Sequence, residues 1–166
     1  DAQESRGLGD VYKRQAMNLV YRPARPEDAA ACIDLRGRTR ENAFSADDLR
    51  AVGVTQESWS DGIRDGALPG VVALADGVLA GYCFGDRESG EIMVLALLPA
   101  YEGLGIGRAL LAQVMAMLRQ AGHTRLFLSC AADPHVRSYG FYRHLGWVAT
   151  GERDEAGDDV LAYQYE

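Results

Sequence analysis

The sequence is poor in the features that mark secreted, metal-binding and membrane proteins. It has only three cysteines, far apart and without a CxxC or Cys/His cluster: Cys32, Cys83 and Cys130. Neither a disulfide framework nor a zinc site is therefore expected, and a reducing cytoplasm is the compartment that suits these thiols. No apolar run approaches the roughly 20 residues that span a bilayer, so we expect no membrane partner. Residues 1–16 also lack the apolar stretch of a signal peptide.

Basic charge is scarce as well. The chain has 17 Lys and Arg against 24 Asp and Glu, which gives a formal net charge of −7. A nucleic-acid-binding protein usually carries a basic face, so we expect no nucleic-acid partner. The acidic balance suits a cationic amine substrate, or a surface that only keeps the protein in solution. The three histidines, at 123, 135 and 144, are scattered, and no metal site is expected.

Length and pattern indicate one domain preceded by a separate leader. A chain of 166 residues suits a single domain. Residues 1–16 show no apolar periodicity, whereas an ordered-looking segment opens at Met17. We expect residues 1–16 to be a leader that is either foreign to the natural protein or disordered, and residues 17–166 to be the domain.

Helical and strand patterns alternate along residues 17–166. Ser45 with Asp48 resembles a capping box, Thr55 is a candidate cap, and Asp76-Gly77 is a hairpin signal. The clearest helix runs from Gly105 to Ala121, where apolar residues recur at three- and four-residue spacing. Strands are predicted at 19–22, 71–75, 78–84, 91–98, 125–131, 147–153 and 160–165.

The run from Pro99 to Arg108 carries the most chemical information. It places glycines at 103, 105 and 107 between an apolar strand and an amphipathic helix. Successive backbone N–H groups at a helix start form a cradle for an anion such as pyrophosphate, and Arg108 adds a full positive charge. A P-loop would need Gly-Lys-Ser/Thr and a Rossmann fingerprint would need glycine at 108, so neither is present. A tight turn that binds nothing is the alternative reading.

Two blocks resemble the GNAT superfamily of acetyl-CoA-dependent N-acetyltransferases. Glu102–Gly107, EGLGIG, is similar to the Arg/Gln-x-x-Gly-x-Gly/Ala pyrophosphate loop, and Phe141–Trp147 is similar to the Phe-Tyr-x-x-x-Gly-Phe/Trp segment. The opening LVYRPARPEDA resembles the first strand and helix, so the likeness covers about residues 18–166. It implies an α/β (α+β) fold: a single GNAT-type domain whose central, mixed, largely antiparallel sheet of six to seven strands has helices on both faces.

The resemblance also implies acetyl-CoA as co-substrate, without a metal, and a set of residues that bind it. Its pantetheine arm would run along Leu95, Leu97 and Leu98, with a bulge near Leu97 that frees an N–H to polarise the thioester carbonyl. The pyrophosphate would lie on the backbone N–H groups of Gly103, Leu104, Gly105, Ile106 and Gly107, beside Arg108.

This sequence departs from the family pattern at two places. Glu102 stands where Arg or Gln is commoner, and a carboxylate there opposes a pyrophosphate unless its side chain points away. His135 and Ser138 occupy the positions of the family's Asn-x-x-Ala, so the usual Asn contact to the pantetheine arm is missing or replaced.

Three residues are candidates for the chemical step. The resemblance assigns Glu91 as the base that deprotonates the amine, with a water chain or an ordinary polar strand residue as alternatives. It assigns Tyr142 as the acid that protonates the leaving thiolate, with an aromatic packing residue as the alternative. Cys130 would support a rival acetyl-cysteine mechanism.

The expected function is N-acetylation of a primary amine by direct attack in a ternary complex. The acceptor would be a small molecule, or a protein N-terminus or lysine. The alternative is a module that binds acetyl-CoA for sensing or interaction without turnover. Relatives often dimerise, so a homodimer is possible.

Overall fold

The computed structural model describes residues 17–40 and 43–166, and the expectation for the leader at 1–16 falls outside these ranges. Within them, the chain forms seven strands and seven helical segments. The strands are β1 (Leu19–Pro23), β2 (Gly70–Ala75), β3 (Val78–Gly85), β4 (Ile92–Leu97), β5 (Arg125–Cys130), β6 (Val148–Arg153) and β7 (Asp159–Gln164). The helices are η1 (Pro26–Asp28), α2 (Ala29–Arg36), α3 (Ala46–Ala51), α4 (Gln56–Arg64), η2 (Pro99–Tyr101), α5 (Ile106–Gln120) and α6 (Arg137–His144).

The strands form two antiparallel sheets rather than one continuous sheet. The first has the order β1-β2-β3-β4 and the second the order β5-β7-β6. Among the described residues, a single parallel bridge between Glu91 and Phe127 connects the two. The predicted fold class is confirmed, with seven strands that are almost all antiparallel, and the split between β4 and β5 is a feature that the sequence did not indicate.

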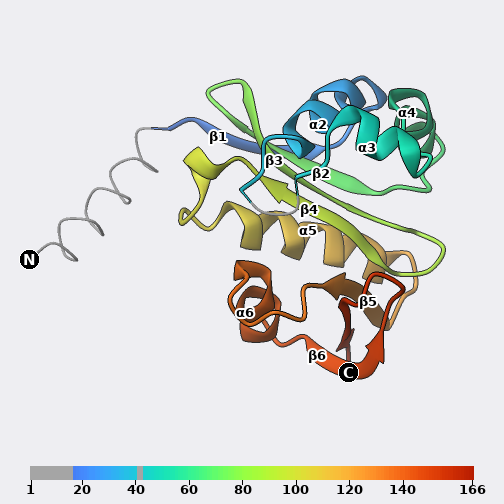
Figure 1. Cartoon of the computed structure of the whole chain (residues 1–166). Helices are drawn as coiled ribbons and strands as arrows, with labels where there is room; N and C mark the ends of the chain where they lie inside the picture. The colour runs from blue at the N-terminus through green and yellow to red at the C-terminus, as the bar shows by residue number, and fades with distance from the viewer. Residues whose placement is uncertain (1–16, 41–42) are drawn as a thin grey trace, which may run out of the picture.

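Helices cover both faces of the first sheet (Figure 1), as predicted. On one face, α2 and α4 enclose a core in which the rings of Trp59, Tyr82 and Phe84 meet edge to face at 5.4–5.6 Å. On the other face lies α5, whose apolar stripe is buried against both sheets: Ile106, Leu110, Leu111, Val114 and Leu118. This stripe places the N-terminus of α5 beside the end of β4.

Local sequence signals explain several element boundaries. Ser45 and Asp48 form the predicted capping box of α3, and the Thr55 side chain accepts a bond from Ser58 N–H at the start of α4. Asp76 and Gly77 both have positive φ, as a tight hairpin between β2 and β3 requires. No helix in the described ranges is long and apolar enough to cross a membrane.

Candidate active site

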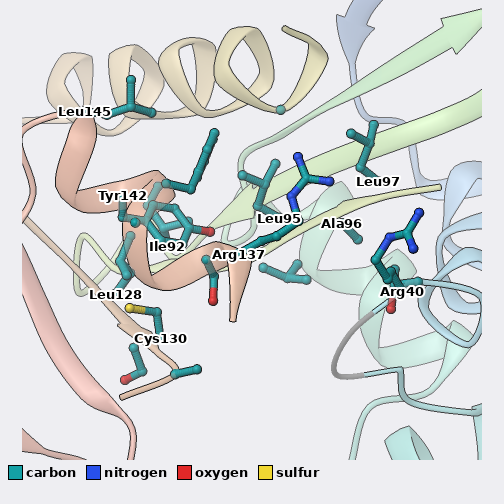
Figure 2. Close-up of a pocket in the computed structure, with 18 of the residues that line it drawn as sticks. Arg40, Ile92, Leu95, Ala96, Leu97, Leu128, Cys130, Arg137, Tyr142 and Leu145 are labelled. Carbon is teal, nitrogen blue, oxygen red and sulfur yellow. The ribbon is translucent and has the colours of Figure 1, made fainter. Parts of the chain in front are cut away.

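A cavity of about 780 Å³ opens where β4 and β5 separate. Close to the bridge the strands are still joined, because Phe127 N–H donates to the Gly90 carbonyl at 3.2 Å. Further along, β4 and β5 form opposite walls, and α6, the start of α5 and the segment after α2 complete the lining (Figure 2). The site is therefore built by elements from both sheets.

The backbone of β4 alternates between the two sides of this opening. Leu98 N–H donates to the Ala80 carbonyl of the β3 side at 2.9 Å. Because strand backbone groups alternate in direction, the N–H groups of Ala96 and Val94 also point to β3, and those of Leu95 and Leu97 point to the cavity. Leu95 and Leu97 line the cavity, whereas Leu98 does not and packs in the core beside α2.

The bulge expected near Leu97 is at the other end of β4. Pairing is regular from Gly81 opposite Leu97 to Phe84 opposite Val94, and the register then shifts so that Gly85 lies opposite Ile92. The extra residue is Met93, which is 52% exposed, whereas Ile92 is 4% exposed. The bulge turns Ile92 to the face that packs against α5, so burial of that side chain explains its position.

The glycine-rich loop has the geometry of an anion cradle. Gly103 and Gly105 have φ of 78° and 81°, and Gly105 is the N-cap of α5. The side chains of Leu104 and Ile106 are buried in the core and anchor the loop, so their ligand contacts could only be through the backbone. Gly107 lines the cavity, as does Arg108.

Glu102 is bound by two arginines that the sequence analysis did not single out. Arg40 Nε lies 3.0 and 3.2 Å from its two carboxylate oxygens, and Arg137 forms a second ion pair with it. All three residues line the cavity. The arginines come from the segment after α2 and from the first residue of α6, far from Glu102 in the sequence, so no local signal could have identified them.

Helix α6 brings further predicted residues to the cavity. Ser138 lines it, and its Oγ is buried without a hydrogen-bond partner among the described residues. A buried hydroxyl costs free energy unless it is bonded, so this atom suits a polar group of a ligand. His135 is exposed outside the lining, where its backbone N–H donates to Asp133 Oδ1.

Tyr142 lies on the cavity wall, and Figure 2 shows its hydroxyl pointing inward. Its ring packs edge to face on Phe141 and Trp147, with centroids 5.1 and 6.3 Å away. Burial raises the pKa of this phenol above its usual value. Tyr142 therefore keeps its proton at neutral pH and can donate it or a hydrogen bond.

Two carboxyl groups near the cavity, those of Glu91 and Asp158, have raised pKa values. Glu91 lies at the β4–β5 bridge and does not line the cavity; burial, then Asp86 and Asp154, raise its pKa. Asp158, which the sequence analysis did not select, does line it, and its pKa is raised by burial and then by Asp154 and Asp159.

Cys130 lines the cavity, but its surroundings do not activate it. Burial raises the pKa of the thiol, and Arg143, 3.9 Å from Sγ, only partly offsets this. A protonated thiol is a weak nucleophile, which disfavours the acetyl-cysteine mechanism. Within residues 17–40 and 43–166, no three His, Cys, Asp or Glu side chains are grouped to hold a metal.

Known proteins resemble this chain over most of its length. An amino-acid acetyltransferase of Pseudomonas putida is 26% identical over 163 residues, which are 98% of this chain and 35% of the relative. A mycothiol acetyltransferase of Acidothermus cellulolyticus is 30% identical over 155 residues, covering 81% of this chain and 46% of the relative. The chain thus spans between a third and a half of the length of these curated relatives.

Solved structures share the fold. The PaiA N-acetyltransferase of Thermoplasma acidophilum, in complex with coenzyme A, has a TM-score of 0.75 at 20% identity and covers 90% of this chain and 100% of its own. YncA of Salmonella typhimurium, with its cofactor acetyl-CoA, has a TM-score of 0.70 at 20% identity, and the match covers 90% of this chain and 95% of YncA. A family model described as the acetyltransferase (GNAT) family matches residues 29–147. Since this match covers well over half of the sequence, the chain belongs to the GNAT acetyltransferase family.

Proposed function

We propose that this protein transfers the acetyl group of acetyl-CoA to a primary amine. The observation that carries the proposal is the open edge of β4, where Leu95 and Leu97 present backbone groups to a cavity that ends at the glycine-rich loop. A pantetheine arm could bind these groups as an added strand would, while the N–H groups of the loop bind the pyrophosphate. Two solved structures of the same fold were obtained with coenzyme A or acetyl-CoA, which supports this choice of co-substrate.

The residues of the cavity suit direct transfer. The amine nitrogen would attack the thioester carbonyl, forming a C–N bond, and the C–S bond would then break. Tyr142 would give its proton to the departing thiolate, because its raised pKa keeps the phenol protonated until a strong base forms beside it. An amine of pKa near 10.4 is only about 0.04% neutral at pH 7, so a proton acceptor is also needed.

Glu91 remains the proposed acceptor of the amine proton. Its carboxylate has a raised pKa, which makes it a better base than an ordinary glutamate. It does not line the cavity, so the proton would reach it through water. This proposal combines Glu91 with the water chain that the sequence analysis named as an alternative to direct proton transfer.

The acceptor that we propose is a small molecule, with peptide amines second. Relatives over this region are named for amino acids and for mycothiol, which are small acceptors. The cavity of about 780 Å³ must hold the pantetheine arm together with the acceptor. A compact amine therefore fits this space better than a folded protein surface.

The test is release of CoA thiol from acetyl-CoA by the full chain with amino acids, polyamines, aminoglycosides and N-terminal peptides. A productive amine whose turnover falls in Tyr142→Phe and in Glu91→Gln would support the transfer and both roles. Acetyl-CoA binding without release from any amine would contradict the proposed activity in favour of the sensing module. Turnover that both variants retain would contradict the assigned residues.

A further inference from the structure

Asp158 is a carboxylate of the cavity wall that lacks a positive partner among the described residues. The other carboxylate of the described lining belongs to Glu102, and Arg40 Nε lies 3.0 Å from one of its oxygens. The backbone N–H of Asp158 donates to Asp154 Oδ1 at 2.9 Å, but its carboxylate forms no hydrogen bond or ion pair with residues 17–40 and 43–166. The ionised side chain therefore presents an unbalanced negative charge to the cavity.

The residues around Asp158 add to this imbalance. Burial, then the charges of Asp154 and Asp159, raise the pKa of Asp158 above its usual value. The nearby arginines already bind Asp159: Arg143 Nη2 lies 2.9 Å from Oδ2, and Arg153 Nε lies 3.5 Å from Oδ1. A cation that enters the cavity would therefore give the Asp158 carboxylate the partner that it lacks.

Strand pairing places Asp158 on the face of the second sheet that is turned away from α5. Ser129 of β5 lies opposite Val160 of β7, and Asp158 is two residues before Val160, so the three share one face. On the other face, Leu128 and Leu161 are buried in the core around α5. Ser129 lines the cavity as Asp158 does. A hydroxyl and a carboxylate thus line the cavity from the side of this sheet that α5 does not cover.

Asp158 is also distant from the edge of β4 along which the thioester would bind. Cys130 of β5 pairs with Asp159, so Asp158 belongs to the Cys130 end of the cavity, which Figure 2 shows away from Arg40. Strand β5 lies between β7 and the open edge of β4, and neighbouring strands are about 4.8 Å apart, so the two backbones are separated by roughly 10 Å or more. A group bound by Asp158 is therefore several bonds away from the nitrogen that attacks the thioester. It can also stay charged, whereas an ion pair would hold the attacking nitrogen in its protonated, unreactive form.

We propose that Asp158, with Ser129 beside it, binds a second cationic group of the acceptor, such as the distal ammonium of a diamine. An ammonium group has three N–H donors, and the carboxylate and the hydroxyl can each accept from one of them. The acceptor that this geometry selects carries one amine that reacts and one positive charge that does not. The inference names the acceptor class of the proposed function and rests on that function.

CoA release by the full chain with putrescine and with pentylamine tests the second charge, because these amines have the same length and differ by an ammonium in place of a methyl group. The ratio of their kcat/KM values should fall about tenfold in Asp158→Asn, the size of one part-exposed contact between charged groups. Comparing this ratio between variants cancels the different basicities of the two amines. The fall should come from a higher KM for putrescine, while kcat and the KM for pentylamine and acetyl-CoA stay unchanged. Asp158→Glu should keep most of the ratio, because the charge is retained.

The matched control is Glu155→Gln. Glu155 is exposed in the same turn between β6 and β7 and does not line the cavity, so this variant loses the same charge without changing the cavity wall. An equal fall of the ratio in both variants would assign the preference to the net charge of −7 and overturn the role of Asp158. Ser129→Ala should lower the ratio less, by about threefold, because a neutral hydrogen bond is lost.

Three further outcomes have separate meanings. A ratio that is unchanged in Asp158→Asn, or that falls through kcat alone, would overturn the inference. Release from other amines without turnover of putrescine would contradict the inference and leave the proposed function intact. Absence of release from every amine would contradict the proposed function itself. Thermal unfolding of each variant checks that the fold is retained.

Discussion

Strand β4 carries the same backbone groups along both edges, but the two edges are used differently. Along β3 the pairing runs from Gly81 opposite Leu97 to Gly85 opposite Ile92, and Leu98 N–H continues it to the Ala80 carbonyl. Along β5, the described residues form only the bridge between Glu91 and Phe127. One edge therefore holds the sheet together, and the other opens onto the cavity.

The comparison shows how β4, at the edge of the first sheet, is held in place although one of its sides is open. Leu95 and Leu97 pack with the core that α5 closes, so the strand is fixed by β3 and by its own side chains. Its open edge then provides N–H and C=O groups that a ligand can pair with. In the proposed function, one side of these six residues stabilises the sheet and the other side binds the ligand.

Proline substitutions on β4 should give the largest effect, because they distinguish the edge that pairs with β3 from the edge that faces the cavity. Ala96→Pro removes an N–H that points to β3 and leaves a buried carbonyl unpaired, so we expect it to lower the free energy of unfolding by about 3 kcal/mol. Leu97→Pro removes an N–H on the cavity side and should weaken acetyl-CoA binding. Measured against Leu97→Ala, which accounts for the lost side chain, it should lower the free energy of unfolding clearly less than Ala96→Pro does. Urea unfolding and calorimetry measure the two quantities. Equal losses of stability would show that both edges are paired within the protein.

Two buried tyrosines, one on each side of the first sheet, give the next largest contrast. Burial raises the pKa of both Tyr142 and Tyr82, but only Tyr142 lines the cavity. Tyr142→Phe should lower kcat about 100-fold with little change in KM for acetyl-CoA, because a general acid is lost. Steady-state kinetics with a productive amine provide the measurement.

The control for this prediction is Tyr82→Phe. The Tyr82 hydroxyl is buried without a hydrogen-bond partner among the described residues. Its removal should leave kcat unchanged and raise stability by about 1 kcal/mol, since an unsatisfied polar atom leaves the core. A comparable fall of kcat in both variants would mean that Tyr142 acts through packing rather than as an acid.

Glycines in the loop beyond β4 should show a smaller contrast. Gly105 has a φ of 81°, so Gly105→Ala should destabilise the protein by about 1 kcal/mol and weaken acetyl-CoA binding. Gly107 lies inside α5, and an added Cβ would meet Phe141 Cζ at 3.8 Å, an ordinary contact. Gly107→Ala should therefore raise stability by about 0.5 kcal/mol. Thermal unfolding distinguishes them, and similar effects would contradict the special role of the left-handed backbone.

The sequence predicted those features that depend on neighbouring residues. The helix expected from Gly105 to Ala121 is α5, with ends shifted by one residue, because apolar spacing and flanking glycines are local signals. The capping box at Ser45 and the Asp76-Gly77 hairpin are confirmed for the same reason. The family resemblance selected Leu95, Leu97, Ser138 and Tyr142 as site residues, and all four line the cavity, while their roles stay predictions.

Other features depend on pairs that are distant in the sequence. Glu102 meets an arginine 62 residues before it and another 35 residues after it, and nothing near any of the three predicts the contact. The bulge was misplaced because it depends on which face of the sheet buries Ile92. Asp158 was missed because the turn before β7 carries several acidic residues, and only the fold shows which one lines the cavity.

The smallest effect on stability is expected at Glu91, which forms the bridge to Phe127 where the open edge of β4 begins. Burial and the charges of Asp86 and Asp154 raise the pKa of this carboxyl, so the folded state binds its proton more tightly than the unfolded state does. Stability from this group is therefore complete below the unfolded pKa, falls as pH rises to the folded pKa, and stays lower above it. Glu91→Gln mimics the protonated form.

This variant should consequently be slightly more stable than wild type at pH 7 and equal to it near pH 3.5. Urea unfolding at both pH values measures the difference, and Glu88→Gln, on the exposed turn before β4, is the control with no expected change. A variant that is less stable at pH 7 would show that the Glu91 charge supports the bridge to β5 instead of opposing it. The one β-bridge that the described residues form between the two sheets would then depend on an ionised carboxylate at the point where the cavity begins.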